Sequence, residues 1–338
     1  MPDGAEERLE TTVAALRRPE TYPGEVFGVE AIETHMSWVF LTESHAYKLK
    51  KPVRTRYLDS STRAARRRAC ETEIELNRRL AESVYLKVAA LAETPAGLKV
   101  DGEGRAVDWL VKMRRLPREQ MLDRRIEEGV VRPEEIERLS EKLTGFYQSV
   151  EAAPFDGPDY RRRIAEDIEA KRASLLRPRY GIRRDDLRAV ATGLGRWLVE
   201  WGDTLEGRGG RVVEAHGDLR PEHVCLELEP VVIDCLAFDR QLRLLDPVSE
   251  LCFLALECRR LGASSVGQKV LRHYADAGGD AFSRRLIPFY ESYHALVRAA
   301  VAVWHIDDET LDDADSRRRQ GNAYLRLARH LLETPTLE

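Results

Sequence analysis

The sequence lacks an excess of basic charge, and it lacks any hydrophobic run long enough to cross a membrane. Its 58 aspartates and glutamates outnumber its 54 lysines and arginines, and the formal net charge is −4. Nucleic-acid-binding domains usually carry a basic excess, and a membrane span needs roughly 18 consecutive apolar residues. We therefore expect neither nucleic acid nor a membrane as a partner.

Paired cysteines and a secretory signal are also missing. The five cysteines form no C-x-x-C pair and lie in apolar or helical stretches, which is typical of reduced, buried thiols. The N-terminal segment MPDGAEERLETTVAALRRPE is acidic and amphipathic, whereas a signal peptide is basic and then apolar. These features predict a cytoplasmic protein.

Lysine is scarce, and a third of the lysines lie close together. Only nine of the 54 basic residues are lysines, and three of them, Lys48, Lys50 and Lys51, fall in the segment AYKLKKP. A chain that otherwise uses arginine has placed ammonium groups together there. A nucleotide phosphate would be their natural counter-charge.

The length and the hydrophobic patterns predict two lobes. A chain of 338 residues exceeds the usual size of one hydrophobic core. Residues 5–18 are spaced as an amphipathic helix, and short alternating runs up to residue 115 predict strands. Among these, SWVFLT and HAYKLKK predict an antiparallel pair with its turn at Glu43 and Ser44. A long helix follows, with Ser60 or Ser61 as its predicted N-cap.

From Pro117 onwards the pattern is mostly helical. Amphipathic helices are predicted over residues 132–153, 159–176, 184–207, 246–262, 266–278, 284–306 and 313–333. The exception is a short β-rich insertion at residues 211–236. The fold class that follows is α+β.

The β-rich insertion contains HGDLRPEH followed by VVIDC. A hairpin is predicted whose strands, residues 211–216 and 224–228, lie on either side of a loop, and a further strand is predicted to end near Asp234. Gly217 relaxes the backbone before Asp218, and Pro221 stiffens the loop. Phosphoryl transfer from a nucleotide needs two such carboxylates, one to accept the proton of the attacking hydroxyl and one to hold a divalent metal.

These motifs resemble the catalytic loop and metal-binding aspartate of the protein-kinase-like fold. They are most similar to the aminoglycoside phosphotransferase and choline kinase-like family, where H-G-D replaces the H-R-D of protein kinases. The resemblance covers about residues 25–300 and implies a two-lobed fold. Residues 1–115 would form a small β-rich nucleotide-binding lobe, and residues 116–338 a larger, mostly helical lobe with the catalytic loop at 214–238.

The resemblance implies a role for each candidate in the loop. Asp218 would be the catalytic base, Asp234 the Mg²⁺ ligand, and Arg220 a cation near the transferred phosphate. The segments AYKLKKP and HGDLRPEH are together similar to a subgroup often fused to a P-loop kinase-like domain. The sequence contains no G-x-x-x-x-G-K-[ST], so we expect a stand-alone form.

The N-terminal candidates follow from the same resemblance. Ala46 to Lys48 resembles the V-A-I-K strand, so Lys48 would contact the α- and β-phosphates of ATP, with Lys50 as the alternative. Glu73 on the long helix would be its acidic partner, and Glu71 and Glu75 are alternatives.

Two further segments complete the resemblance. VKMRRLP, with Met113 and Arg115, resembles the hinge whose backbone holds adenine. LLDPVSELCFL resembles the GDPxxDLA segment of the phosphotransferases, in which Asp246 would brace the catalytic loop.

The sequence departs from the family pattern at two places. His223 stands where the family has a metal-binding asparagine, and a histidine ligand suits Mn²⁺ better than Mg²⁺. The strand–turn–strand IETHMSWVF has no glycine where protein kinases have a Gly-rich loop. The hydroxyl of Thr34 or Ser37, together with turn amides, would have to contact the phosphates.

Three functions are compatible with these residues. The leading one is an ATP-dependent kinase, with Mg²⁺ or Mn²⁺, that phosphorylates a hydroxyl of a small molecule bound by the helical lobe. Scattered acidic residues there would suit an aminoglycoside or another cationic acceptor. The alternatives are a nucleotide-binding pseudokinase or regulatory protein, which His223 suggests, and a hydrolase whose metal is held by His216, Asp218, His223 and Asp234. The sequence gives no oligomeric state.

Overall fold

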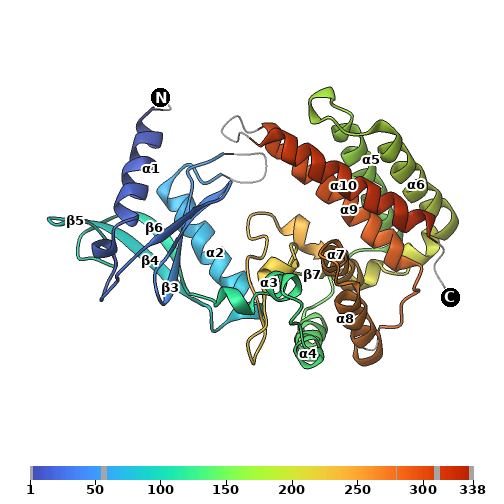
Figure 1. Cartoon of the computed structure of the whole chain (residues 1–338), viewed down its shortest axis with the longest axis horizontal. Helices are drawn as coiled ribbons and strands as arrows, with labels where there is room; N and C mark the ends of the chain where they lie inside the picture. The colour runs from blue at the N-terminus through green and yellow to red at the C-terminus, as the bar shows by residue number, and fades with distance from the viewer. Residues whose placement is uncertain (1–2, 55–58, 279, 308–312, 335–338) are drawn as a thin grey trace. The chain divides into compact units, whose positions relative to one another are not determined.

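The computed structural model describes residues 3–54, 59–278, 280–307 and 313–334. The chain forms two compact units: Met1–Arg124 with Glu222–Leu242, and Arg125–Pro221 with Arg243–Glu338 (Figure 1). The predicted α+β, two-lobed architecture is confirmed. The segment after the HGD loop groups with the N-terminal unit, while the assignment of a nucleotide-binding lobe to residues 1–115 stays a prediction.

The first unit is built on a six-stranded sheet in the order β1-β2-β3-β6-β4-β5, in which all neighbours are antiparallel. The strands are β1 (Glu30–Glu33), β2 (Ser37–Leu41), β3 (His45–Lys50), β4 (Tyr85–Thr94), β5 (Gly97–Val100) and β6 (Arg105–Arg114). The predicted pairing of SWVFLT with HAYKLKK is confirmed. The unit also contains the 3-10 helices η1 (Pro19–Thr21) and η2 (Arg118–Gln120).

One helix covers each face of this sheet, and β3 alternates between them. Ala46 belongs to the core cluster shared with helix α2 (Arg63–Ala81). Tyr47 and Leu49 belong to the cluster shared with helix α1 (Asp3–Leu16). Because side chains alternate along a strand, Lys48 lies on the same face as Ala46, towards α2.

The N-cap of helix α2 is Thr62, which follows the two predicted N-cap residues. The prediction of Ser60 or Ser61 was wrong, because the hydroxyl of Thr62 accepts the backbone N–H of Ala65 at 3.1 Å. Ser61 Oγ instead donates to Asp59 at 2.5 Å. The Asp59–Ser61 contact forms a local turn, which leaves the capping position to the next hydroxyl.

The strands around the HGD loop pair differently from the prediction. Strand β7 (Val213–Glu214) pairs with β10 (Leu244–Leu245), and β8 (Val224–Cys225) pairs with β9 (Val231–Val232). The loop therefore does not join two strands of one hairpin. Short 3-10 helices flank these strands at Pro221–His223 (η5) and Arg240–Arg243 (η6).

The second unit is mostly helical. Its helices are α4 (Pro133–Ser149), α5 (Gly157–Leu175), α6 (Arg184–Glu206), α7 (Pro247–Arg260), α8 (Ser264–Ala277), α9 (Leu286–Trp304) and α10 (Ala314–Glu333). The short helix α3 (Leu122–Glu127) precedes them, and η3 (Pro178–Tyr180), η4 (Gly209–Arg211) and η7 (His305–Asp307) lie between them. All seven long helices were predicted to within a few residues.

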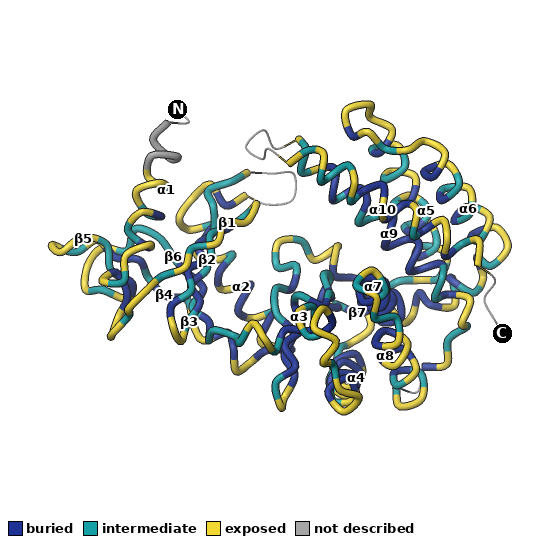
Figure 2. The backbone as a smooth tube through the Cα atoms, in the orientation of Figure 1, coloured by how far each residue is buried: buried dark blue, intermediate teal, exposed yellow. Residues whose placement is uncertain are grey.

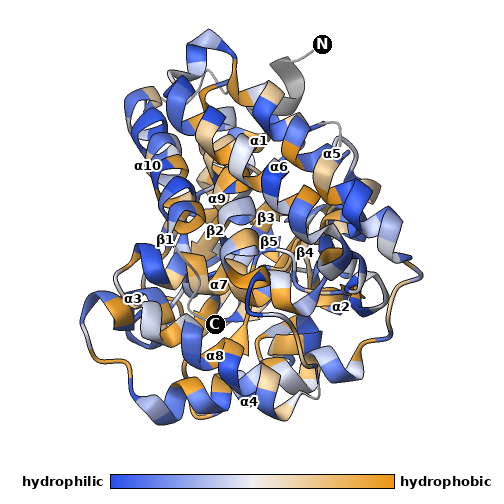
Figure 3. Cartoon of the chain, turned by 90° about the vertical axis from the view of Figure 1, so that its right-hand side faces the viewer, coloured by the Kyte–Doolittle hydropathy of each residue, from blue (hydrophilic) through white to orange (hydrophobic). Residues whose placement is uncertain are grey.

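Helices α7 and α9 form the centre of the second unit. Nearly all residues of α7 and most residues of α9 are buried, while α5, α6 and α10 alternate between buried and exposed positions (Figure 2). The same alternation appears as hydrophilic and hydrophobic bands along the outer helices (Figure 3). All five cysteines are free and buried, as predicted. Among the described residues, no helix has the length and apolar character of a membrane span.

Candidate active site

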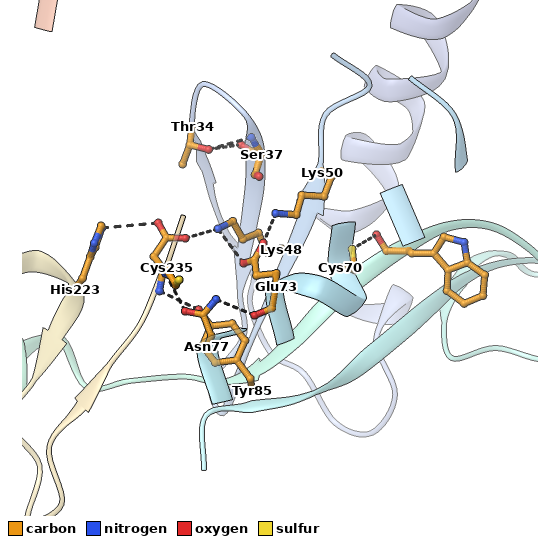
Figure 4. Close-up of polar contacts among 12 residues, drawn as sticks. Thr34, Ser37, Lys48, Lys50, Cys70, Glu73, Asn77, Tyr85, His223 and Cys235 are labelled. Atoms are coloured by element: carbon orange, nitrogen blue, oxygen red, sulfur yellow. Dashed lines mark hydrogen bonds and ion pairs between the residues drawn. The ribbon is translucent and has the colours of Figure 1, made fainter. Parts of the chain in front are cut away.

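Lys48 is the centre of a buried ion-pair cluster in the first unit (Figure 4). Its Nζ lies 3.0 Å from Oε1 of Glu73 on α2 and 2.6 Å from Oδ1 of Asp234, which follows β9. The Glu73 side chain is 2% exposed, whereas that of Asp234 is 47% exposed. One ammonium group therefore joins strand β3, helix α2 and the segment after β9.

The charges in this cluster stabilise one another. Burial alone would lower the pKa of Lys48, but Asp234 and Glu73 raise it well above its ordinary value. Burial would raise the pKa of Glu73 and of Asp234, but Lys48 brings both below their usual range. All three groups are therefore charged at neutral pH.

Lys50 occupies the other side of Glu73. Its Nζ contacts Oε2 of Glu73, and no described contact joins it to Asp234. The alternatives to Glu73 point elsewhere, because Glu71 pairs with Arg67 at 2.9 Å and Glu75 is exposed. Of the two candidate lysines, Lys48 alone bridges Glu73 and Asp234 in the described part of the chain.

The backbone at Asp234 is held in an unusual conformation. Asp234 has φ 63°, in the left-handed region, which aspartate tolerates better than most residues. Its N–H donates to the hydroxyl of Tyr85 at 3.1 Å, and the N–H of Cys235 donates to Oδ1 of Asn77 at 2.9 Å. These bonds to β4 and α2 fix the direction in which the Asp234 carboxylate points.

His223 faces the free side of the Asp234 carboxylate. Its Nε2 lies 3.7 Å from Oδ2 of Asp234, opposite the oxygen that contacts Lys48 (Figure 4). The backbone carbonyl of His223 accepts the N–H of Ile233 at 2.9 Å, which ties the end of η5 to the segment after β9. The two predicted metal ligands are therefore neighbours.

Hydrogen bonds between its own residues hold the turn between β1 and β2. The hydroxyl of Thr34 donates to the carbonyl of Ser37 at 2.9 Å and accepts its N–H at 3.0 Å. Ser37 is buried, with 2% exposure. A role for Ser37 in phosphate binding stays a prediction.

The predicted hinge residues lie at the end of β6. Met113 is paired on both sides, opposite Ala46 and Tyr85, and its side chain is buried in the core. Arg115 is tied to the β2–β3 turn, because its N–H donates to Ser44 and its guanidinium donates to the carbonyl of Thr42 at 2.7 Å. Their contact with adenine stays a prediction.

Asp218 lies in the second unit and forms an ion pair with Arg220. Oδ1 and Oδ2 of Asp218 lie 2.9 and 3.0 Å from the Arg220 guanidinium. Gly217 adopts φ 91°, a conformation that suits glycine and that explains its place before Asp218. The N–H of Asp218 donates to Nδ1 of His216 at 3.3 Å, so His216 braces the loop.

The sequence interpretation missed the residue that anchors this loop. Glu250 on α7 accepts the N–H of His216 at 3.0 Å and the N–H of Gly217, and also the hydroxyl of Tyr147 at 2.7 Å. Asp246, the predicted brace, instead contacts the guanidinium of Arg208 at 2.7 Å. Glu250 could have been noticed because it is a lone acid in the apolar stretch SELCFLAL.

A metal site made of protein ligands alone is not evident. Among the described residues, no group of three or more histidine, cysteine, aspartate or glutamate side chains is arranged to hold a metal ion. Asp234 and His223 offer one carboxylate and one imidazole to a metal. This pair suits Mn²⁺, and a carboxylate with nucleotide phosphates suits Mg²⁺.

The chain is similar to curated proteins of mycobacteria. An uncharacterized protein of Mycobacterium tuberculosis is 32% identical over 281 residues, which is 81% of this chain and 54% of that protein. The counterpart in Mycobacterium bovis matches equally well. The chain therefore spans about half the length of the curated relatives it matches. No family model matches the sequence.

Solved structures with the same fold include proteins named as kinases and phosphotransferases of small molecules. A choline/ethanolamine kinase family protein from Mesorhizobium loti has a TM-score of 0.53 at 16% identity, over 96% of each chain. The GDP complex of aminoglycoside 2'-phosphotransferase-IIIa has a TM-score of 0.53 at 12% identity, over 95% of this chain and 98% of that one.

A third structure contains both a nucleotide and a sugar. Glucosamine kinase in complex with glucosamine, ADP and inorganic phosphate has a TM-score of 0.52 at 13% identity, over 89% of this chain and 80% of that one. The predicted resemblance to the aminoglycoside phosphotransferase and choline kinase-like family is thus confirmed at the level of the fold. Fusion of relatives to a P-loop domain stays a prediction.

Proposed function

We propose that the protein is an ATP-dependent phosphotransferase that moves the γ-phosphate to a hydroxyl of a small molecule. The observation that carries this proposal is the contact of Lys48 with both Glu73 and Asp234. A lysine between a helix glutamate and a metal-binding aspartate is the arrangement that positions nucleotide phosphates in this fold. The nucleotide-bound and sugar-bound kinases of the same fold support the proposal.

In the proposed reaction Asp218 is the general base. The acceptor oxygen attacks the γ-phosphorus, its proton passes to the Asp218 carboxylate, and the bond from the γ-phosphorus to the bridging oxygen breaks to release ADP. Arg220 holds the Asp218 carboxylate by its ion pair and would thereby fix its orientation. Glu250 acts through the loop backbone as a positioning residue.

Asp234 and His223 would hold a divalent metal, which would neutralise charge on the nucleotide phosphates. The Oδ2 of Asp234, turned away from Lys48, and the imidazole of His223 are the donors available. Met113 and Arg115 would lie near adenine, and Ser37 near the phosphates, as the resemblance implies.

The test is acceptor-dependent formation of ADP by the purified protein, compared with Asp218→Asn. A general base contributes about 10²- to 10⁴-fold to the rate, so the variant should lose that factor in kcat while it binds ATP as the wild type does. Unchanged turnover in Asp218→Asn would contradict the proposed role of this residue.

A nucleotide-binding regulatory protein is the second candidate. It is favoured by one observation, the imidazole of His223 beside Asp234 where the family has an amide oxygen. This candidate predicts ATP binding without ADP formation in the presence of any acceptor. Restoration of turnover by His223→Asn would then identify His223 as the cause.

A further inference from the structure

The second unit contains a cavity of about 440 Å³ that the proposed reaction does not use. It lies where helices α6, α9 and α10 pack side by side (Figure 1). Its described lining comes from α6, from the segment that leads into α9, from α9 itself and from the end of α10. Ligand pockets measure about 300–1,000 Å³, so this cavity has room for a small molecule.

The wall of the cavity is largely aromatic and aliphatic. The ring of Trp197 on α6 stacks on the buried ring of Phe289 on α9, with centroids 4.0 Å apart and planes inclined by 20°. Trp201 follows one turn later on α6, and Leu332 faces the cavity from α10. The rings of Trp197 and Trp201 are half-buried. Such a surface suits the flat, apolar body of a ligand.

Helix α6 is bent at this cavity. Trp201 has φ −128° and ψ 19°, which is not helical. The guanidinium of Arg161 on α5 donates to the carbonyl of Leu198 at 2.8 Å, and a regular helix would offer that carbonyl to the N–H of Gly202. The same guanidinium lies so close to Gly202 that a Cβ there would clash with it. A side chain inserted into the helix therefore sets the bend, and the position of Trp201 is preformed.

The polar part of the cavity is cationic. Two arginines, Arg284 and Arg285, belong to the described lining, and no carboxylate does. The guanidinium of Arg285 lies 4.1 Å from the ring centroid of Trp201 and covers that ring. The Arg284 side chain is exposed and forms no ion pair within the described part of the chain. Its guanidinium is available to an anionic group at the edge of the aromatic wall.

Acidic residues near the cavity do not cancel this charge. Asp280, four residues before Arg284, is buried, and both of its oxygens accept the guanidinium of Arg208 at 2.6 Å. Glu333 on α10 is bonded to Arg329 at 2.8 Å. The other acids on this part of α6 are exposed and outside the described lining, so water and salt screen them: Glu200 and Asp203.

We infer that this cavity is a second binding site, and that its ligand is an aromatic carboxylate. The apolar body packs against Trp197, Trp201 and Leu332, and the carboxylate pairs with Arg284. An arginine fork matches the geometry of a carboxylate, and a cationic ligand would meet like charge. The site does not depend on the proposed function, because no residue of the proposed reaction belongs to the described lining.

The test compares three probes that share one aromatic body and differ in charge: 1-naphthaleneacetate, 1-naphthaleneacetamide and 2-(1-naphthyl)ethylamine. Isothermal titration of the wild type should show the acetate bound at least about tenfold more tightly than the amide, and the amine more weakly than the amide. Equal affinities for acetate and amide, or no binding of any probe at millimolar concentration, would overturn the inference.

Arg284→Met should bring the affinity for the acetate down to that for the amide. Arg326→Met is the matched control, since Arg326 is an exposed arginine on α10 outside the described lining of this cavity. It should keep the preference for the acetate. Both positions are exposed, so both variants should fold. A preference retained in Arg284→Met, or lost equally in both variants, would overturn the inference.

Trp201→Leu tests the aromatic wall and should weaken all three probes that bind. Trp304→Leu, which removes a tryptophan at the other end of α9, should leave the affinities unchanged. Thermal denaturation establishes that each variant is folded. Unchanged affinities in a folded Trp201→Leu would overturn the inference, and if that variant does not fold, the comparison of Arg284→Met with Arg326→Met decides.

Binding of the acetate should be the same in the wild type, in Asp218→Asn and in Lys48→Ala, Asp234→Ala. Loss of binding in Asp218→Asn would place the probe at the catalytic loop and overturn the inference. No binding of ATP by a wild type that still binds the acetate would remove the phosphotransferase and leave this site standing. The two proposals therefore fail separately.

Discussion

The ammonium of Lys48 lies 2.6 Å from the carboxylate of Asp234, although 186 positions separate them in the chain. Lys50, two residues away on the same face of β3, contacts Glu73 but has no described contact with Asp234. Substitutions of the two lysines can therefore be compared directly. A role in nucleotide binding would affect Lys48 more, and a role in local charge balance would affect both lysines alike.

Lys48→Met should weaken ATP binding by at least about tenfold. The substitution removes a cation that the phosphates would contact, and it leaves the carboxylates of Glu73 and Asp234 without their shared partner. Lys50→Met should have a smaller effect, since Lys48 would still contact Glu73. Isothermal titration with ATP and Mn²⁺ measures both. Equal losses in the two variants would contradict the assignment of Lys48.

Glu250→Gln should slow turnover without changing the contacts of Asp218 itself. A glutamine offers one acceptor oxygen and turns an NH₂ group towards the remaining donors, so the loop loses a bond and the free energy of unfolding falls by about 1–3 kcal/mol. We expect kcat to fall while the affinity for ATP is kept. Tyr147→Phe, which removes only the hydroxyl bonded to Glu250, is the milder control.

His223→Asn should change which metal supports activity. An amide oxygen is a harder ligand than an imidazole nitrogen, so the substitution should raise the ratio of activity with Mg²⁺ to activity with Mn²⁺. Initial rates at saturating concentrations of each metal measure this ratio. An unchanged ratio would show that His223 does not contact the metal.

A buried histidine should make the second unit sensitive to acid. Burial lowers the pKa of His294 from 6.5 to about 4, and its Nε2 lies 2.9 Å from the hydroxyl of Ser249. Because the unfolded chain binds the proton more tightly, His294 contributes stability that is complete above pH 6.5 and is lost as the pH falls towards 4.

The loss should approach about 3 kcal/mol by pH 4 and should be about 2 kcal/mol at pH 5. Urea denaturation at pH 7.5 and pH 5 measures it, and His294→Gln should reduce the difference between the two. His330→Gln, at an exposed position on α10, should leave the difference as in the wild type. An equal difference in the free energy of unfolding between the two pH values in all three proteins would contradict this prediction.

Local patterns predicted most of the elements of this fold. The seven long helices of the second unit and the β2–β3 pair follow from hydrophobic spacing, because most of these elements bury one continuous face. Alternation along β3 also explains why Lys48 and Lys50 both reach α2. The candidate residues themselves came from a resemblance between motifs.

The wrong or missing predictions concern strand pairing, the N-cap of α2 and the role of Glu250, which depend on tertiary contacts. Strands β7 and β8 are two residues long, so their own sequences do not select a partner, and the pairing with β10 and β9 is set by distant segments. Thr62 is the N-cap of α2 because the hydroxyl of Ser61 donates a hydrogen bond to Asp59. Glu250 accepts hydrogen bonds from the N–H groups of Gly217 and His216, 33 and 34 positions away, and no local sequence pattern predicts such contacts.

The central claim is that Lys48, Glu73 and Asp234 form a nucleotide site. The most direct measurement is the shift in thermal midpoint caused by ATP with Mg²⁺ or Mn²⁺, in the wild type and in Lys48→Ala, Asp234→Ala. A ligand at 100 times its dissociation constant stabilises a protein by about 2.7 kcal/mol, so the wild type should show a clear increase with at least one metal and the variant none. No increase in the wild type with either metal, or an equal increase in the variant, would contradict the claim.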